Sequence, residues 1–361
     1  MSEVKLMKGN EAVAEAAILA GVDAYFGYPI TPQSEVIEYL MVERPEDRTG
    51  MVVLQAESEI AAINMVYGAA GAGKKVMTSS SSPGISLKQE GISYIAASEL
   101  PCVIVNVVRG GPGLGTIQPS QADYFQSTKG GGHGDYRLVV LAPASVQEMA
   151  DFVEDAFKIA FKYRTPVMIL SDGVIGQMME KVVMPKQKKR LSNEEIIERY
   201  GSWATIGKPK SRERNIVTSL ELDSYKQEAH NIKLQKKYKQ IQENEVRFEK
   251  INCDDAEYII VAYGSSARIA QKAMNLAREK GIKVGIFRLI SLFPFPKNEI
   301  NALADKVKGF LAVEMSAGQM IEDVQLAING KVKAEHFGRY GGVIHSPEEV
   351  LEALEHKIIG G

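Results

Sequence analysis

Short apolar runs recur along the first half of the chain, and polar or amphipathic stretches separate them. The runs predict strands at residues 24–27, 51–55, 75–79, 102–107, 138–142 and 167–171. The stretches between them predict helices at residues 10–20, 33–40, 59–70, 85–97 and 146–163. Asn10 is expected to cap the first helix, and Gly21 is expected to close it. Apolar strands that alternate with helices are typical of an α/β domain with a mostly parallel sheet, whose ligands bind beyond the carboxyl ends of the strands.

A second alternation begins at Tyr258. It predicts strands at residues 258–263, 284–289 and 309–314, helices at residues 267–280, 297–308 and 319–329, and a last helix opened by Pro347. We therefore divide the chain into a first domain (residues 1–185), a polar linker or arm (186–255) and a second domain (256–361).

The arm contains a charged segment at residues 224–250, and its few apolar residues follow helical spacing. Leu234, Tyr238, Ile241 and Phe248 form one thin apolar stripe along it. An arm that packs on the chain's own domains is the simpler interpretation, and an arm that docks another subunit is the alternative.

The composition excludes several classes of protein. A net charge of -2 gives no reason to expect a nucleic acid or an anionic membrane as partner. No apolar run reaches the roughly 18 residues that indicate a membrane span. The first residues lack the apolar core of a signal peptide, so we expect a cytoplasmic protein. The two cysteines, Cys102 and Cys253, lie far apart and cannot alone form a disulfide framework or an iron–sulfur ligand set.

Candidate chemistry concentrates between Gly27 and Gly68. The segment Tyr28-Pro29-Ile30-Thr31-Pro32 predicts a rigid turn that presents the Thr31 hydroxyl at the carboxyl end of a strand. Glu59 then lies in the first turn of an alanine-rich helix, where the helix dipole stabilises a carboxylate. A carboxylate among small apolar residues suits a group that holds or shares a proton in a dry site. The alternative is that Glu57 and Glu59 are both solvated residues of the helix start.

Two further loops follow predicted strands and are expected at the same sheet edge. The loop from Ser79 to Gly84 is small and polar, and its serines suit either a ligand or the cap of the following helix. Arg109 ends an apolar strand, and an arginine delivered by a buried strand needs an anionic partner. A substrate carboxylate and an internal Asp or Glu are both suitable partners.

These motifs carry a specific resemblance. Tyr-Pro-Ile-Thr-Pro at 28–32, followed by Glu-x-Glu-Ile-Ala-Ala at 57–62, resembles the α subunit, or pyrimidine domain, of the thiamine diphosphate-dependent 2-oxoacid:ferredoxin oxidoreductases. Outside residues 186–255, the whole chain most resembles the branched-chain 2-oxoisovalerate subtype. The resemblance implies a thiamine diphosphate-binding parallel-sheet domain of pyrimidine type, followed by an α/β domain like the C-terminal domain of transketolase.

The resemblance also assigns roles to residues. Glu59 lies nine positions before Gly68, as the catalytic glutamate of related enzymes does, and is therefore preferred to Glu57. It would hydrogen-bond to the aminopyrimidine ring and promote deprotonation of the thiazolium carbon. Thr31 and Arg109 would bind the substrate carboxylate. The residues that would contact the cofactor are Tyr28, Pro29, Ile30, Ser81 and Gly84.

One motif of thiamine enzymes is missing. They hold magnesium with a Gly-Asp-Gly motif and a downstream Asn, whereas the nearest candidate, Ser171-Asp172-Gly173 with Asn193, lacks the first glycine. The chain is therefore expected to hold no metal and only the pyrimidine end of a shared cofactor. Magnesium, the diphosphate site and the iron–sulfur clusters would belong to partners, namely a β subunit and further small subunits.

The function implied is CoA-dependent oxidative decarboxylation of a branched 2-oxoacid such as 3-methyl-2-oxobutanoate, with ferredoxin as electron acceptor. Pyruvate or 2-oxoglutarate is the alternative substrate. The alternative roles are a non-catalytic assembly subunit and a self-sufficient thiamine-dependent decarboxylase or transketolase relative. The missing magnesium motif argues against the last.

Overall fold

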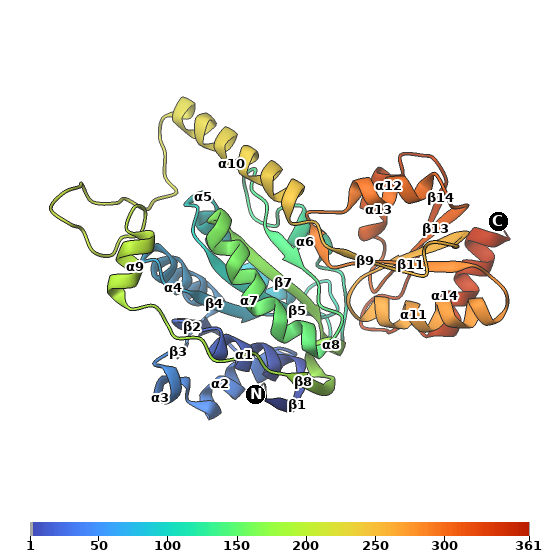
Figure 1. The fold of residues 1–361 in the computed structure, drawn as a ribbon, viewed down its shortest axis with the longest axis horizontal. Helices are drawn as coiled ribbons and strands as arrows, with labels where there is room; N and C mark the ends of the chain where they lie inside the picture. The colour runs from blue at the N-terminus through green and yellow to red at the C-terminus, as the bar shows by residue number, and fades with distance from the viewer. Residues whose placement is uncertain (1–2, 361) are drawn as a thin grey trace.

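The computed structural model describes residues 3–360, which form two α/β units and a long arm (Figure 1). The first unit is built on a seven-stranded sheet with the order β12-β6-β7-β5-β4-β2-β3. Its strands are β2 (Ala24–Gly27), β3 (Val52–Gln55), β4 (Val76–Ser80), β5 (Cys102–Val108), β6 (Val139–Leu141), β7 (Pro166–Asp172) and β12 (Ser291–Phe293). All neighbours pair in parallel except β12, which is antiparallel to β6. The predicted parallel α/β architecture is confirmed.

The strands at the centre of this sheet are buried because helices cover both faces. β5 and β7 are buried at every position, and so is the more polar β4. The main helices are α1 (Gly9–Leu19), α2 (Ser34–Glu43), α4 (Glu59–Gly71), α5 (Ser82–Ala97) and α7 (Val146–Tyr163). α1 packs on α7, and α4 packs on α5. Three short helices complete the unit: α3 (Pro45–Thr49), α6 (Tyr124–Thr128) and α8 (Gly173–Gln177).

The start of α1 differs from the prediction. Lys8 occupies the N-cap position, α1 begins at Gly9, and Asn10 lies inside the helix. The buried Asn10 amide instead donates to the Pro32 carbonyl oxygen (2.7 Å) and to a Glu35 carboxylate oxygen (2.7 Å). Asn10 is therefore not a cap but a support for the turn that contains Thr31. Just before α1, β1 (Val4–Lys8) pairs antiparallel with β8 (Met179–Val183) in a separate two-stranded ribbon.

The second unit has a five-stranded sheet with the order β14-β13-β10-β11-β9. Its strands are β9 (Phe248–Ile251), β10 (Tyr258–Ala262), β11 (Val284–Leu289), β13 (Gly309–Glu314) and β14 (Lys333–Gly338). Its helices are α11 (Gly264–Glu279), α12 (Lys297–Ala304), α13 (Met320–Ile328) and α14 (Pro347–Leu354), which continues into the π-turn η1 (Glu355–Ile359). Pro347 opens α14 as predicted, and Ser346 caps it.

Buried hydrogen bonds join the two units. One carboxylate oxygen of Asp172 accepts from the backbone at the start of α8, and the other accepts from the Ser265 amide (3.1 Å) and hydroxyl (2.8 Å) at the start of α11. The Gln121 side chain similarly accepts from the Ser266 hydroxyl (2.7 Å) and the Met315 amide (2.9 Å). Because these groups are buried, separating the units would leave several polar atoms without partners. The relative placement of the two units is therefore well defined.

The arm contains α9 (Asn193–Tyr200) and α10 (Ser224–Asn244), and α10 runs across the first unit, in yellow in Figure 1. Leu234, Tyr238 and Ile241 are buried as its apolar stripe predicts. Lys233 and Lys237 both pair with the Glu99 carboxylate. α10 therefore packs on the chain's own first unit. Phe248 is not part of the stripe, because it lies in β9 and stacks on Phe287.

Among residues 3–360, no helix combines the length and the apolar character that crossing a bilayer requires.

Candidate functional site

Three loops converge at the carboxyl edge of the first sheet. Arg109, at the end of β5, is only 6% exposed, and its guanidinium donates to the Thr31 carbonyl oxygen (2.8 Å) and to the Leu114 carbonyl oxygen (3.1 Å). The Ser82 hydroxyl at the start of α5 accepts from the Arg109 amide (3.1 Å) and donates to the Arg109 carbonyl oxygen (3.2 Å). The sequence motifs around Thr31, Ser82 and Arg109 are thus in direct contact.

The charge of Arg109 is not neutralised within the described part of the chain. Its partners are backbone carbonyl groups, no carboxylate of residues 3–360 forms an ion pair with it, and its buried Nε has no acceptor. The structure therefore does not show the internal Asp or Glu that was the alternative partner. A buried guanidinium of this kind can bind an anionic ligand through charge-assisted hydrogen bonds.

The two candidate glutamates have different environments. Ser58 caps α4 by accepting from the Ala61 amide, and Glu59 follows as the first helical residue. Glu59 is 6% exposed, whereas Glu57 is exposed before the helix. Solvation by bulk water thus describes Glu57 but not Glu59. No hydrogen bond to the Glu59 carboxylate comes from the other residues of the 3–360 range, so its oxygens remain available to a ligand.

Glycines on α5 allow this helix to approach Glu59 closely. A Cβ atom at Gly84 would lie 2.1 Å from the Ser80 hydroxyl oxygen and 2.8 Å from Glu59 Oε1. One further contact of the same kind follows along the helix, because a Cβ atom at Gly91 would lie 2.5 Å from Ile63 Cγ2. Glu59 and Ile63 are one turn apart on α4, so α4 and α5 meet along these two glycines. Gly84 therefore fixes the position of the Glu59 carboxylate.

The turn before α2 rests on buried polar groups that the sequence pattern did not reveal. The Gln33 amide donates to the Tyr28 carbonyl oxygen (3.0 Å), and its oxygen accepts from Ser79 (2.5 Å). Ser79 also bonds to the Tyr25 hydroxyl (2.6 Å). Together with Asn10, these groups hold a turn in which Tyr28, Pro29 and Ile30 are half-buried and Thr31 is exposed. Their spacing along the chain gives no motif, because each partner is distant in sequence.

Ser80 and Ser81 complete the wall beside Glu59. Both are fully buried, and neither hydroxyl has a hydrogen-bond partner among the described residues. Ser81 occupies the N-cap position of α5 without making the side-chain cap bond, so the capping alternative is wrong for this residue. Buried hydroxyl groups without partners are costly. The Glu59 carboxylate, which accepts no hydrogen bond from the described residues, and these two hydroxyls fit a bound heterocycle that carries polar ring atoms.

A cavity of about 730 Å³ opens next to Arg109, between the two units. The first unit lines it with Ser82, Arg109 and Asp123, and the second unit with Gln319 and Tyr340. Burial raises the pKa of the Asp123 carboxyl, and the hydrogen bond that it accepts from the Asn106 amide (2.9 Å) opposes this shift. The first turn of α5 lines the cavity with Ser82 and contacts the Glu59 carboxylate with Gly84. Together they form the candidate active site.

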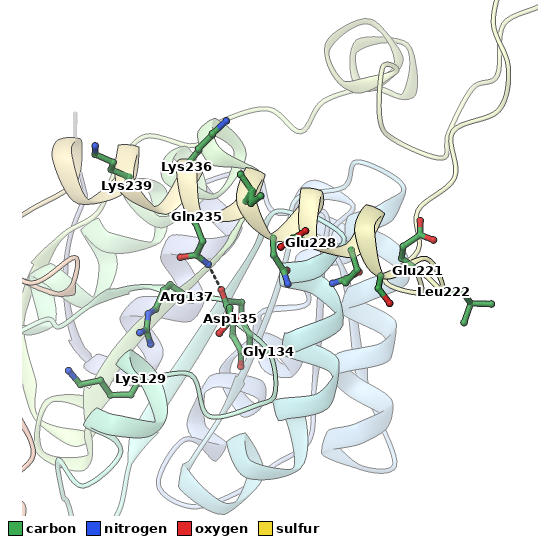
Figure 2. Close-up of a pocket in the computed structure, with 15 residues that line it drawn as sticks. Lys129, Gly134, Asp135, Arg137, Glu221, Leu222, Glu228, Gln235, Lys236 and Lys239 are labelled. Atoms are coloured by element: carbon green, nitrogen blue, oxygen red, sulfur yellow. Dashed lines mark hydrogen bonds between the residues drawn. The ribbon is translucent and has the colours of Figure 1, made fainter.

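A larger groove of about 930 Å³ lies elsewhere, between α10 and the loop at residues 129–137 (Figure 2). The Gln235 amide crosses it to the Asp135 carbonyl oxygen (2.7 Å). Basic Lys129, Arg137 and Lys236 face acidic groups along its walls, so it favours neither charge. None of Thr31, Glu59 and Arg109 lines this groove, and it is not part of the candidate site.

The residues of the incomplete magnesium motif, Asp172 and Asn193, make contacts with other parts of the chain. Asp172 caps α8 and binds Ser265, and the Asn193 amide oxygen accepts from Lys74 (2.8 Å). Over residues 3–360, no group of three or more His, Cys, Asp or Glu side chains is arranged to hold a metal ion.

Comparison with known proteins decides the family. Residues 15–245 match the family model described as pyruvate flavodoxin/ferredoxin oxidoreductase, thiamine diphosphate-binding. The chain belongs to this family. Residues 256–350 match core domain II of pyruvate:ferredoxin oxidoreductase. The chain is 52% identical, over 97% of both chains, to ketoisovalerate oxidoreductase subunit VorB of Methanothermobacter thermautotrophicus. It is 39% identical, over 99% of this chain and 100% of the relative, to 2-oxoglutarate synthase subunit KorA of Archaeoglobus fulgidus.

Two solved structures share the fold of this chain. 2-Oxoglutarate:ferredoxin oxidoreductase from Magnetococcus marinus, solved with 2-oxoglutarate, coenzyme A and succinyl-CoA, matches with a TM-score of 0.84 and 27% identity. The match covers 99% of this chain but 65% of that longer chain. A split-gene transketolase matches over 97% of both chains with a TM-score of 0.60 and 14% identity, which shows a shared fold. The predicted family and the predicted fold, a pyrimidine-type domain followed by a transketolase C-terminal-like domain, are confirmed.

Proposed function

We propose that this chain is the pyrimidine-binding α-type subunit of a multi-subunit 2-oxoacid:ferredoxin oxidoreductase. The complex would catalyse CoA-dependent oxidative decarboxylation of 3-methyl-2-oxobutanoate, the substrate named in its 52% identical relative. The observation that carries the proposal is the buried Glu59 carboxylate, held against Gly84 and left open to a ligand. Both cysteines are buried, and burial raises the pKa of the Cys102 thiol to about 12, which favours iron–sulfur clusters on partner subunits.

Each residue of the site has a distinct task. When bound, thiamine diphosphate supplies the carbon nucleophile and the electron sink for decarboxylation. The buried Glu59 carboxyl would hold a proton at the pyrimidine ring nitrogen, where burial limits access of water. Gly84 lets α5 approach the Glu59 carboxylate. The half-buried turn at Tyr28, Pro29 and Ile30 would contact the cofactor together with Ser81. Arg109 and the Thr31 hydroxyl bind the substrate carboxylate and orient the keto carbon.

The cavity beside Arg109 favours a monocarboxylate. Among its described lining residues Arg109 is the one cation, and Asp123 is the one carboxyl group. Pro83, Pro112, Ala122 and Ala317 supply apolar wall. The second carboxylate of 2-oxoglutarate would find no cation there, whereas a branched apolar side chain would pack against this apolar wall. Comparing kcat/KM of the complex for 3-methyl-2-oxobutanoate, pyruvate and 2-oxoglutarate tests this preference.

Arg109→Met in the assembled complex is expected to raise KM for the 2-oxoacid by about 100-fold, since the loss of charge-assisted hydrogen bonds costs about 3 kcal/mol. Steady-state kinetics measures the change. Arg137→Met is the matched control, because the Arg137 guanidinium also donates to a backbone carbonyl group, that of Thr128 (3.2 Å), but outside the candidate site. An unchanged KM in Arg109→Met would contradict the proposed role.

The shared cofactor site predicts that the chain alone binds thiamine diphosphate weakly. Calorimetry with magnesium present should detect tight binding only for the complex co-expressed with its partner subunits. Nanomolar affinity of the isolated chain would instead favour a self-sufficient thiamine enzyme. Unchanged turnover after replacement of Thr31, Glu59 and Arg109 would favour a non-catalytic assembly subunit.

A further inference from the structure

Lys88, on α5, is a fully buried cation that the proposed chemistry leaves without a task. Its side chain is 0% exposed, and its ammonium group donates to the Thr78 hydroxyl on β4 (3.1 Å). Among residues 3–360, no carboxylate lies within ion-pair distance of it. Burying a cation against one neutral hydroxyl is costly, so a folding role alone would be better served by an apolar residue.

The position of Lys88 on α5 connects it to the candidate site. Gly84, Lys88 and Gly91 are spaced by four and three residues, and such residues share one face of a helix. Gly84 and Gly91 on this face contact Glu59 and Ile63 of α4. Lys88 therefore lies on the side of α5 that packs on α4, one turn beyond the glycine that touches the Glu59 carboxylate.

Glu59 is the charged group that acts on Lys88. Burial lowers the pKa of the Lys88 ammonium to about 8, and the negative charge of Glu59 opposes this shift. From β4 the facing group is the neutral Thr78 hydroxyl. Lys88 thus carries its charge at neutral pH and loses it as the pH rises above about 8. The Lys88 ammonium group and the Glu59 carboxylate thus attract each other across the contact between α5 and α4.

We propose that Lys88 is a positioning residue for the catalytic carboxylate: its buried ammonium group, on the same face of α5 as Gly84, supplies the positive charge that stabilises Glu59 in place. The inference rests on the proposed role of Glu59. Gly84 and Lys88 on this face of α5 would then act together, because the glycine lets the helix contact the carboxylate and the lysine supplies the opposite charge.

The direct test is a titration of Glu59 in the full chain without cofactor. Infrared difference spectra follow the C=O band of the protonated carboxyl, which is assigned by its loss in Glu59→Gln. Lys88→Met keeps the length of the side chain but removes its charge, and it should raise the Glu59 midpoint by about one pH unit or more. Lys75→Met is the matched control. Burial also lowers the pKa of Lys75. Lys75 directly precedes β4 and donates to the Ala20 carbonyl oxygen, at the end of the strand remote from Ser80. Its replacement should therefore leave the Glu59 midpoint unchanged.

An unchanged Glu59 midpoint in Lys88→Met, or equal shifts in the two lysine variants, would overturn the inference. Should Lys88→Met fail to fold, Thr78→Val keeps the charge but removes the hydrogen-bond acceptor of the ammonium group. Without this acceptor Lys88 should lose its charge at a lower pH, so the alkaline change in kcat of the complex should occur at a lower pH in Thr78→Val than in the wild type. An unmoved profile would again overturn the inference. Full turnover of Glu59→Gln would instead refute the proposed function, whatever the lysine variants show.

Discussion

Glu59→Gln in the assembled complex is expected to lower the rate of decarboxylation by about 1,000-fold, the usual contribution of a positioned acid–base group. Glutamine preserves the size of the buried side chain but cannot hold or release the proton. Carbon dioxide release from 3-methyl-2-oxobutanoate measures the rate, and size-exclusion chromatography verifies that the complex still assembles.

Glu57→Gln is the matched control for this experiment. Glu57 is only two positions away but is exposed, so its replacement should change the rate by less than about twofold. If Glu57→Gln abolishes activity while Glu59→Gln does not, the assignment of the catalytic acid is wrong.

Gly84→Ala is the second substitution with a large expected effect. The added Cβ would lie 2.1 Å from the Ser80 hydroxyl oxygen and 2.8 Å from Glu59 Oε1, so the helix or the carboxylate must move. Displacing a catalytic group by about 1 Å costs about 100-fold in rate. We expect a loss of this size in kcat/KM of the complex.

Gly68→Ala provides the matched control, because Gly68 is a helical glycine of α4 with no atom within 4 Å of its added Cβ. It should leave kcat/KM unchanged and raise the free energy of unfolding by about 0.5–1 kcal/mol. Full activity of Gly84→Ala would show that contact with α5 does not fix Glu59.

The sequence predicted best the buried strands and one strongly amphipathic helix. The strands at residues 24–27, 284–289 and 309–314 and the helix at residues 146–163 have the predicted bounds. The missed strands lie at the edges of the sheets or in the two-stranded ribbon, and all but β12 are only partly buried, so their apolar pattern is weak. β14 is half-buried or exposed at every position, and β12 has only three residues.

The candidate site was predicted only as far as its motifs reach. Thr31, Ser81, Gly84 and Arg109 all lie shortly after the ends of strands, and the common edge of a parallel sheet brings such positions together. The supporting contacts carry no local signal. Asn10 was interpreted as a cap because asparagine favours that position, whereas its actual acceptor, the Pro32 carbonyl oxygen, is 22 residues away. Lys88 looks like any other helical lysine until the packing of α5 on α4 is known.

The antiparallel pairing of β12 with β6 has a consequence for truncated forms of the protein. Residues 291–293 follow most of the second unit's sheet in sequence, yet they form the border of the first unit's sheet. A fragment that ends near residue 255 would lack this border and expose the backbone amide and carbonyl groups of β6. An uncovered edge of this kind recruits strands from other molecules, so such a fragment is prone to aggregate even though its own core is intact. Circularly permuted or split versions should therefore keep residues 291–293 with the N-terminal half.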